Sequence, residues 1–382
     1  MDGLVSIVIP LYNLERYIAG TIDSILKQNY PNFEVIIVND QSTDHSLQIA
    51  RGYAERCSKI DLISLDKNSG ASVAMNKGME KAKGEYLTFI AADDLLRHDR
   101  FEKIVNIFKS KPDIDIICSG CSLIDSDGNN LNRDYYFPPY LNNDNILLNE
   151  LKRNYILGGT LALRREMGQK YKYDQSLRTS EDYDLFLRMV YDGHKFYYID
   201  EPLVKYRIHS SNKSANYDKT MISTKKILKK FSFCKLYNKL KKKGCYDKEI
   251  FNSFAVVSLV KRDFEQGIFY IEKAINEEGN PVDQLESYFY AGVLFFKINN
   301  IKRSEESFKK ALIINTKEPT IYNNLGVIIA PKDRCQAESH FKEALAYQPN
   351  YMDAQHNLLQ LKEGFKPDKL TEKLLRKRVV HI

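Results

Sequence analysis

The stretch of residues 86–94 constrains the fold most. A mostly apolar, β-rich run over 86–90 is followed by two adjacent carboxylates, Asp93 and Asp94. A buried strand of this kind ends at the edge of a sheet, and acidic side chains that follow it can bind a cation there. Capping of a helix expected over residues 100–109 is the simpler explanation, because Asp is a favoured N-cap residue. Both interpretations are open at this point.

The chain before this stretch repeats one unit of strand, turn and helix. Apolar runs that predict strands cover residues 4–10, 32–40, 61–65 and 86–90. Apolar residues at helical spacing predict helices over residues 17–26, after residue 44, and over 72–82. Strands that alternate with helices are typical of an α/β fold with a mostly parallel sheet covered on both faces.

Polar side chains follow three of these strands directly. Asp40, Asn68 and Asp93 each lie just past a predicted strand end. Ligands bind at the carboxyl ends of such strands, so we expect the three residues to meet in one crevice. A dinucleotide-binding oxidoreductase is disfavoured, because the turn over residues 10–15 has no glycine to let a pyrophosphate approach the backbone. Without a glycine cradle, phosphates would need a metal ion.

Five blocks in order carry a resemblance to a known family. They are VSIVIPLYN at 5–13, VIIVNDQSTD at 35–44, NSGASVAMNKG at 68–78, the strand that ends at Asp93, and SEDYDLFLR at 180–188. Together they resemble family 2 glycosyltransferases with the GT-A fold, a Rossmann-like α/β domain. The resemblance implies hexosyl or N-acetylhexosaminyl transfer from a nucleotide sugar, most often a UDP-sugar, with inversion at the anomeric carbon and a divalent metal, Mn²⁺ or Mg²⁺.

The resemblance also assigns donor-binding roles residue by residue. The expected donor residues are Pro10, Tyr12 and Glu15 at the base and ribose, Asp40 at the uracil, Asn68, Gly70 and Asn76 closing the donor pocket, and Asp93 at the metal. Two departures stand out. The first acid of the family's Asp-x-Asp motif is Ala91 here, and the arginine usual beside Asn76 is Met75. Reduced metal affinity, an unusual donor or an inactive relative could follow from them.

His209 is the candidate for a second metal ligand. Neutral imidazole is a common metal ligand, although a lone histidine is more often a surface residue. In similar glycosyltransferases the segment around residues 207–213 folds over the diphosphate. His209 would then compensate for Ala91 beside Asp93.

The acceptor side is expected around residues 158–159 and 181–182. Inverting transfer needs a carboxylate opposite the leaving diphosphate to take the proton of the attacking group. The resemblance places this base at Asp182, with Glu181 orienting the acceptor or the base, and small residues near Gly158 and Gly159 beside the acceptor. Favourable electrostatics of acids in the first turn of a helix, and an ordinary glycine turn, are the simpler explanations.

The second half of the chain consists of a lysine-rich segment followed by a repeating pattern. Lysines interleaved with apolar residues predict a basic amphipathic linker helix over 219–245, after a GT-A domain over 1–218. This helix either bridges two domains or contacts an anionic membrane surface or acidic acceptor. Over 246–382 the chain repeats itself with a period of about 34 residues, the length of a tetratricopeptide repeat. Such helix pairs bind peptides or pair subunits, so a protein partner or a homo-oligomer is expected; a purely structural prop is the alternative.

Composition favours an intracellular protein over a nucleic-acid binder or a membrane-spanning protein. The net charge of +7 is mild and concentrated in the linker, which argues against a nucleic-acid binder. No apolar run reaches membrane-spanning length, and six scattered cysteines fit a reducing compartment. The expectation is a cytoplasmic protein, with the inner face of the membrane as the alternative location, that glycosylates a glycan or a protein. The alternative is a weak or inactive donor-binding scaffold that acts through its repeats.

Overall fold

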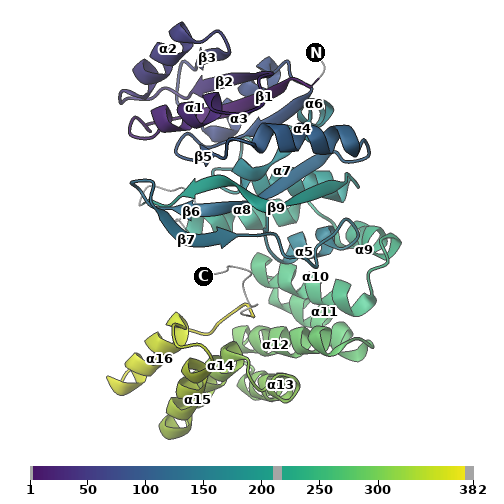
Figure 1. The fold of residues 1–382 in the computed structure, drawn as a ribbon. Helices are drawn as coiled ribbons and strands as arrows, with labels where there is room; N and C mark the ends of the chain where they lie inside the picture. Colours follow the sequence, from purple (N-terminus) through teal and green to yellow (C-terminus); the bar gives the residue numbers. More distant parts are fainter. Residues whose placement is uncertain (1–2, 210–216, 375–382) are drawn as a thin grey trace. The chain divides into compact units, whose positions relative to one another are not determined.

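The computed structural model describes residues 3–209 and 217–374, which divide into two compact units at Ile227 and Leu228. Nine strands in the described part of the first unit form one sheet (Figure 1). They are β1 (Val5–Leu11), β2 (Phe33–Asn39), β3 (Ile60–Ser64), β4 (Tyr86–Phe89), β5 (Leu95–Leu96), β6 (Ile116–Ile124), β7 (Asn130–Tyr135), β8 (Ala162–Arg164) and β9 (Phe196–Arg207).

The helices of the first unit lie between these strands in sequence and pack beside the sheet (Figure 1). They are α1 (Ile18–Leu26), α2 (Ser46–Arg56), α3 (Ala71–Lys81), α4 (Arg100–Ser110), α5 (Ile146–Lys152), the short 3₁₀-helix η1 (Gly158–Thr160), α6 (Arg165–Lys170) and α7 (Glu181–Tyr191), followed by α8 (Tyr217–Lys229), which crosses the boundary.

The sheet order is β3-β2-β1-β4-β8-β6-β9-β5, and β7 pairs with β6. Strands β1 to β4 are parallel to one another, whereas β8 runs antiparallel to both β4 and β6. Every residue of β1 from Val5 to Ile9 is buried, as expected of a central strand with both faces covered. The predicted α/β fold is confirmed. The strand order reverses direction at β1, so the loops after β1, β2, β3 and β4 share one edge.

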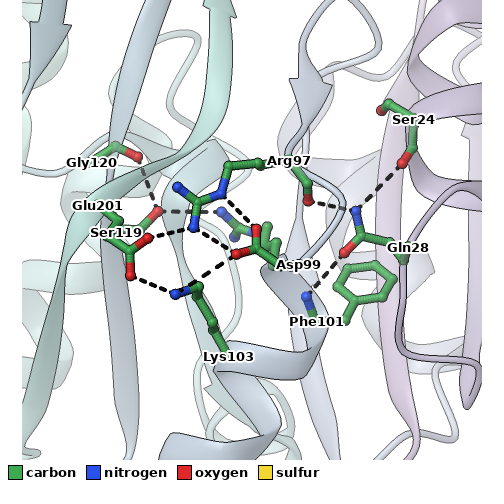
Figure 2. A network of polar contacts seen from close by, with 10 residues as sticks. Ser24, Gln28, Arg97, Asp99, Phe101, Lys103, Ser119, Gly120 and Glu201 are labelled. Atoms are coloured by element: carbon green, nitrogen blue, oxygen red, sulfur yellow. Dashed lines mark hydrogen bonds and ion pairs between the residues drawn. The ribbon is translucent and has the colours of Figure 1, made fainter.

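A surface network fixes the segment that follows β4. Asp99 accepts hydrogen bonds from Arg97 Nε at 2.6 Å and Nη2 at 2.7 Å. Glu201 of β9 accepts from Arg97 Nη2 at 2.5 Å and from Lys103 Nζ at 2.6 Å (Figure 2). Partly exposed ion pairs like these contribute at most about 1 kcal/mol each to stability. The network therefore serves mainly to hold the segment after Asp93 and Asp94 against β9, which ends at Arg207.

The described part of the second unit is helical (Figure 1). Its helices are α9 (Phe233–Lys242), α10 (Asp247–Lys261), α11 (Phe264–Asn276), α12 (Pro281–Lys297), α13 (Ile301–Ile314), α14 (Pro319–Ile329), α15 (Arg334–Tyr347) and α16 (Met352–Lys362). Consecutive helices pack as pairs: α10 with α11, α12 with α13, and α14 with α15.

The positions that repeat in the sequence have the same packing role in successive pairs. A Cβ placed on Gly292 of α12 would meet the ring of Phe308 at 2.7 Å, and one on Gly326 of α14 would meet Phe341 at 2.5 Å. Each glycine therefore admits an aromatic ring from the following helix. In the preceding helix pair, Phe254, Ile271 and Ala274 are also buried.

The structure breaks the predicted linker helix in two. Helices α8 and α9 are separated at residues 230–232, so one continuous helix over 219–245 is not present. On α9, Leu236 and Leu240 are fully buried, and the ring of Phe233 stacks on Phe254 of α10 with centroids 4.5 Å apart. The apolar side of α9 is thus used in packing within the second unit, while lysines such as Lys235 remain exposed.

Candidate active site

The loops after β1, β2 and β3 carry the predicted donor residues of the candidate site. Asp40, directly after β2, is buried, and its two carboxylate oxygens accept hydrogen bonds from the backbone amides of Ser69 at 2.6 Å and Gly70 at 2.8 Å. Gly70 has φ +94°, a conformation that favours glycine. The predicted donor residues Asp40 and Gly70 are therefore in direct contact, and Asp40 shapes the loop that leads into α3. Asn68 is exposed on the same loop.

The loop after β1 is tied to the loop after β2. Tyr12 is an exposed aromatic at its start, with 42% of its surface accessible, beside the half-buried Pro10. Asn13 Oδ1 accepts from the Thr43 amide at 2.8 Å, and a Glu15 carboxylate oxygen accepts from the His45 amide at 2.7 Å. Glu15 thus holds two loops together in this structure. Tyr12 is the member of the predicted base-binding set with an open ring face.

Asn76 lies on α3 and faces inward. Its side-chain amide donates to the Tyr173 carbonyl at 2.9 Å, and its Oδ1 accepts from the Tyr173 amide at 2.8 Å. The side chain is buried, so its contribution to a donor site would come through the position of Tyr173. This pairing joins residues 97 apart in sequence, which local patterns do not reveal.

Asp93 and His209 meet, as the sequence predicts. The Nε2 atom of His209 lies 2.8 Å from Oδ2 of Asp93, and both side chains are nearly buried. The imidazole stacks on the ring of Tyr17 with centroids 5.2 Å apart, so its orientation is fixed. The helix-capping interpretation of Asp93 and Asp94 does not hold, because Asp99 is the residue that precedes α4.

Arg207 donates hydrogen bonds to both Asp93 and Asp94, a role that the sequence did not reveal. Its Nε donates to the Asp93 carbonyl at 2.7 Å, and its backbone amide donates to Asp94 Oδ1 at 2.8 Å. Its guanidinium also lies over the Tyr17 ring, 4.9 Å from the centroid. Burial, and then the neighbouring Asp93 carboxylate, raise the pKa of Asp94 well above its usual range. Asp94 is therefore protonated more readily than an ordinary exposed Asp.

These residues fit a divalent cation of the Mn²⁺ or Mg²⁺ class. A carboxylate and an imidazole in contact form a donor pair that suits these ions. In the described part of the chain no third His, Cys, Asp or Glu joins them. A metal ion held by two protein donors needs further ligands, and phosphate oxygens of a bound nucleotide are suited to supply them.

Asp182 lies in the first turn of α7, against η1. Its Oδ2 accepts from the Gly158 amide at 2.8 Å and its Oδ1 from the Tyr183 amide at 2.8 Å. Burial raises the pKa of Asp182 above its usual value, and these two amides oppose the rise. A carboxylate with a raised pKa is better matched to proton transfer near neutral pH than an ordinary Asp. Ser180, with φ +60°, sets the start of the helix that carries Glu181 and Asp182.

The two glycines of η1 lie close to Asp182 and Asp94. An ideal Cβ on Gly158 would lie 2.9 Å from Asp182 Oδ2, and one on Gly159 would lie 3.6 Å from Asp94 Oδ2. The backbone of η1 therefore lies close to both Asp94 and Asp182.

Two buried polar side chains, Glu150 and Tyr173, lie near enough to Asp182 for its charge to affect them. Glu150 of α5 is fully buried, and burial raises its pKa well above the usual range. The Tyr173 hydroxyl is buried without a hydrogen-bond partner, and burial followed by the charges of Asp182 and Glu181 raises its pKa. Neither residue carried a sequence signal, because each is brought here by a contact between distant segments.

Arg178 is a further residue that the sequence analysis missed. The guanidinium Nη1 lies 3.1 Å from the Cβ position of Gly70, and the side chain is exposed. The residue that follows it is anchored, because Thr179 Oγ1 shares a hydrogen bond of 3.0 Å with Ser223 of α8. The structure thus places a cation beside the Gly70 loop, in a chain that has Met75 in place of the arginine expected from the resemblance.

No helix within residues 3–209 and 217–374 has the length and apolar character needed to cross a membrane.

Comparisons with known proteins identify the family. Residues 6–171 match the model of the family described as Glycosyl transferase family 2. The chain is 34% identical over 214 residues to the putative teichuronic acid biosynthesis glycosyltransferase TuaG of Bacillus subtilis, covering 56% of this chain and 82% of that protein. It is 31% identical over 207 residues to an uncharacterized glycosyltransferase of Methanocaldococcus jannaschii, covering 54% of this chain and 71% of the relative.

A solved structure shares the fold over nearly the whole chain. The crystal structure of S. aureus TarS 1-349 in complex with UDP-GlcNAc has a TM-score of 0.51 and 15% sequence identity, covering 98% of this chain and 96% of that chain. An identity this low establishes a likeness of fold. The predicted GT-A fold and the predicted glycosyltransferase family are confirmed by these matches.

Proposed function

The chain belongs to glycosyl transferase family 2, and we propose that it is an inverting enzyme that moves a sugar from a UDP-sugar donor to a glycan or protein acceptor with a divalent metal ion. The observation that carries the proposal is that η1 lies close to both Asp94 and Asp182. The acid pair and a candidate base are therefore near the same short stretch of backbone. A sugar between them would have its leaving diphosphate at Asp93 and its attacking group at Asp182.

Asp182 is the proposed general base. Transfer with inversion needs a carboxylate that takes the proton of the acceptor hydroxyl as the new bond forms. Two backbone amides, from Gly158 and Tyr183, hold the carboxylate in place, so it is oriented before the acceptor arrives. Glu181 lies one residue earlier in the first turn of α7 and is the proposed orienting residue for the acceptor.

Asp93 and His209 are the proposed metal ligands. When bound, the ion would act as a Lewis acid that offsets the charge of the departing diphosphate. The stacking of His209 on Tyr17 and the bonds from Arg207 hold the two ligands in contact before an ion binds. With Ala91 at the first position of the motif, this pair replaces a pair of aspartates.

The donor side is proposed to bind the nucleotide through Tyr12, Asp40, Gly70 and Arg178. Tyr12 offers an exposed ring on which a base can stack. Asp40 orders the loop at Gly70 through two amides, and each of its oxygens retains a lone pair that can accept from uracil N3. Arg178 adds a guanidinium beside this loop, suited to a base carbonyl or phosphate oxygen of the donor.

Nucleotide preference is the first prediction. We expect UDP to raise the melting temperature of the full chain and GDP to leave it unchanged, since Asp40 is the residue proposed to read uracil N3. A ligand present at tenfold its dissociation constant adds about 1.4 kcal/mol to the free energy of unfolding. Differential scanning fluorimetry with Mn²⁺ present measures this, and Asp40→Asn is expected to lose the selectivity. Equal shifts with both nucleotides would contradict the assignment.

The spacing at η1 gives a second prediction, with a matched control. Gly158→Ala places a Cβ against the Asp182 carboxylate and should displace it, because that Cβ would lie 2.9 Å from Oδ2. Small misplacement of a catalytic group costs up to roughly 10²-fold in rate, so we expect a loss of about tenfold or more in kcat. Gly159→Ala, whose Cβ reaches only ordinary contact distance, should stay within about threefold of the parent. Steady-state assays of both variants test this, and equal effects would contradict it.

A further inference from the structure

A fully buried arginine, Arg100, stands at the start of α4, and none of the steps proposed above uses it. Burial lowers the pKa of its guanidinium to about 9, so the group is still charged at neutral pH. No carboxylate among the residues that the structure describes forms an ion pair with this guanidinium. A buried charge without a counter-ion opposes folding, so its presence at this position needs an explanation.

The polar contacts of Arg100 go to neutral oxygen atoms. Its Nη2 donates to Thr88 Oγ1 at 2.8 Å and to the Leu161 carbonyl at 3.2 Å, and its Nη1 donates to Ser119 Oγ at 3.5 Å. Its Nε is buried without a hydrogen-bond partner in the described part of the chain. Neutral acceptors of this kind do not replace the hydration that a charged guanidinium loses on burial. Stability alone therefore does not explain Arg100.

The Leu161 carbonyl links Arg100 to the candidate site, because Leu161 directly follows η1. The same carbonyl also accepts from Thr88 Oγ1 at 2.8 Å. Arg100 of α4 and Thr88 of β4 thus bond to each other and to one backbone oxygen. Three mutually bonded groups fix the end of η1 more firmly than a single hydrogen bond would.

The short turn of η1 connects this anchor to Asp182. The Leu161 amide donates to the Gly158 carbonyl at 3.1 Å, and the Thr160 amide donates to the Leu157 carbonyl at 2.9 Å. At the other end of the turn, the Gly158 amide donates to Asp182 Oδ2 at 2.8 Å. Two adjacent glycines give this turn more backbone freedom than other residues would, so its position depends on the anchor at its end.

We propose that Arg100 is a positioning residue for sugar transfer: through the Leu161 carbonyl it fixes η1, and through the Gly158 amide η1 fixes the Asp182 carboxylate. This inference rests on the proposed function of Asp182 as the general base. Arg100 does not touch the reacting groups and acts through the backbone. A buried charge that lowers stability is kept because it holds a functional group in place, as costly local features at functional sites often do.

The test is Arg100→Met, which fills most of the same space without the charge. The Leu161 carbonyl keeps its bond from Thr88, and the Ser119 hydroxyl keeps its bond to the Gly120 carbonyl, so neither loses its only partner. We expect a melting temperature equal to or above that of the parent. We also expect kcat to fall about tenfold or more, because small displacements of a reacting group are costly. The KM for the UDP-sugar and the affinity for UDP should not change.

A second variant and a matched control accompany Arg100→Met. Thr88→Val removes the other donor to the Leu161 carbonyl and should lower kcat about threefold or more at unchanged donor KM. Arg164→Met is the control, because Arg164 donates to the carbonyls of Ile114 and Phe108, at 2.8 Å each, rather than to that of Leu161. Its kcat should equal that of the parent. Scanning fluorimetry, steady-state assays and isothermal titration with UDP measure stability, kcat with KM, and affinity.

The route through Asp182 is tested by combining variants. In the Asp182→Asn background, Arg100→Met should cause no further loss of transfer, because both changes act on the same group. Losses that multiply in the double variant would overturn the proposal. So would parent-like kcat in Arg100→Met, or a loss of kcat accompanied by a lower melting temperature, since Arg100 would then serve only the fold. If Arg100→Met does not fold, unchanged kcat in Thr88→Val overturns it.

Failure of this inference and failure of the proposed function give different results. An inactive Asp182→Asn beside a fully active Arg100→Met would overturn the role of Arg100 and leave the general base in place. Parent-like turnover of Asp182→Asn would contradict the proposed base and overturn this inference with it.

Discussion

Asp182→Asn is expected to bind the nucleotide donor normally and to lose sugar transfer by about a hundredfold or more. The side-chain amide keeps the size of the carboxylate but cannot take a proton, and general base catalysis typically contributes about 10²–10⁴ in rate. Donor binding should persist, because the residues proposed to bind the donor, such as Asp40 and Asp93, do not include Asp182. Isothermal titration with UDP and steady-state transfer assays measure the two effects separately.

The control for this variant is Asp200→Asn, an exposed aspartate on β9. A second readout is the pH profile. The base must be deprotonated to act, so kcat/KM should fall as pH decreases through the pKa of Asp182, and burial places that pKa above the usual value for Asp. This acidic limb should disappear in Asp182→Asn. If Asp182→Asn turns over at a rate near that of the parent, Asp182 is not the general base, and Glu181 is the next candidate.

Asp93→Ala is expected to abolish turnover and to remove divalent metal binding in the presence of UDP. The substitution deletes the only carboxylate found in contact with His209 among the described residues. Loss of a Lewis acid worth several kcal/mol corresponds to a rate loss of about 10³-fold or more. Mn²⁺ titration followed by electron paramagnetic resonance, with and without UDP, measures the affinity directly. Binding in the parent should be weak alone and tighter with UDP, because phosphates are themselves ligands.

Two variants refine the metal assignment. His209→Ala should weaken Mn²⁺ binding and leave Asp93 in place, whereas Ala91→Asp, which restores the first acid of the motif, should be tolerated or mildly beneficial. Full activity of Asp93→Ala, or transfer that persists undiminished in EDTA, would show that the acids after β4 do not hold a metal ion.

Sequence patterns predicted the parts of this fold that depend on short-range periodicity. The apolar strands, the helices between them and the placement of Asp40 and Asp93 at strand ends all follow from residues close together in the chain. The sheet then brings distant strand ends together, because parallel strands share a carboxyl edge. The repeat period likewise anticipated the equivalent packing of Gly292 and Gly326.

Contacts between distant segments were beyond these patterns. The pairing of Asn76 with Tyr173 and the position of Arg178 over Gly70 join residues about a hundred positions apart. Residues 366–374 have no periodicity, so nothing in their sequence marks them as hydrogen-bond partners of Asn324 and Asn357. The break between α8 and α9 was also missed, because lysines and apolar residues continue across it.

The central claim is that this chain transfers a sugar from a UDP-sugar with a divalent metal ion. The most direct measurement is release of nucleoside diphosphate by the purified full chain from a panel of UDP- and GDP-sugars, with Mn²⁺ or EDTA. We predict UDP release from at least one UDP-sugar that requires Mn²⁺, is lost in Asp182→Asn and Asp93→Ala, and is absent with GDP-sugars. Tight UDP-sugar binding without release from any donor would contradict the claim and indicate a donor-binding scaffold instead.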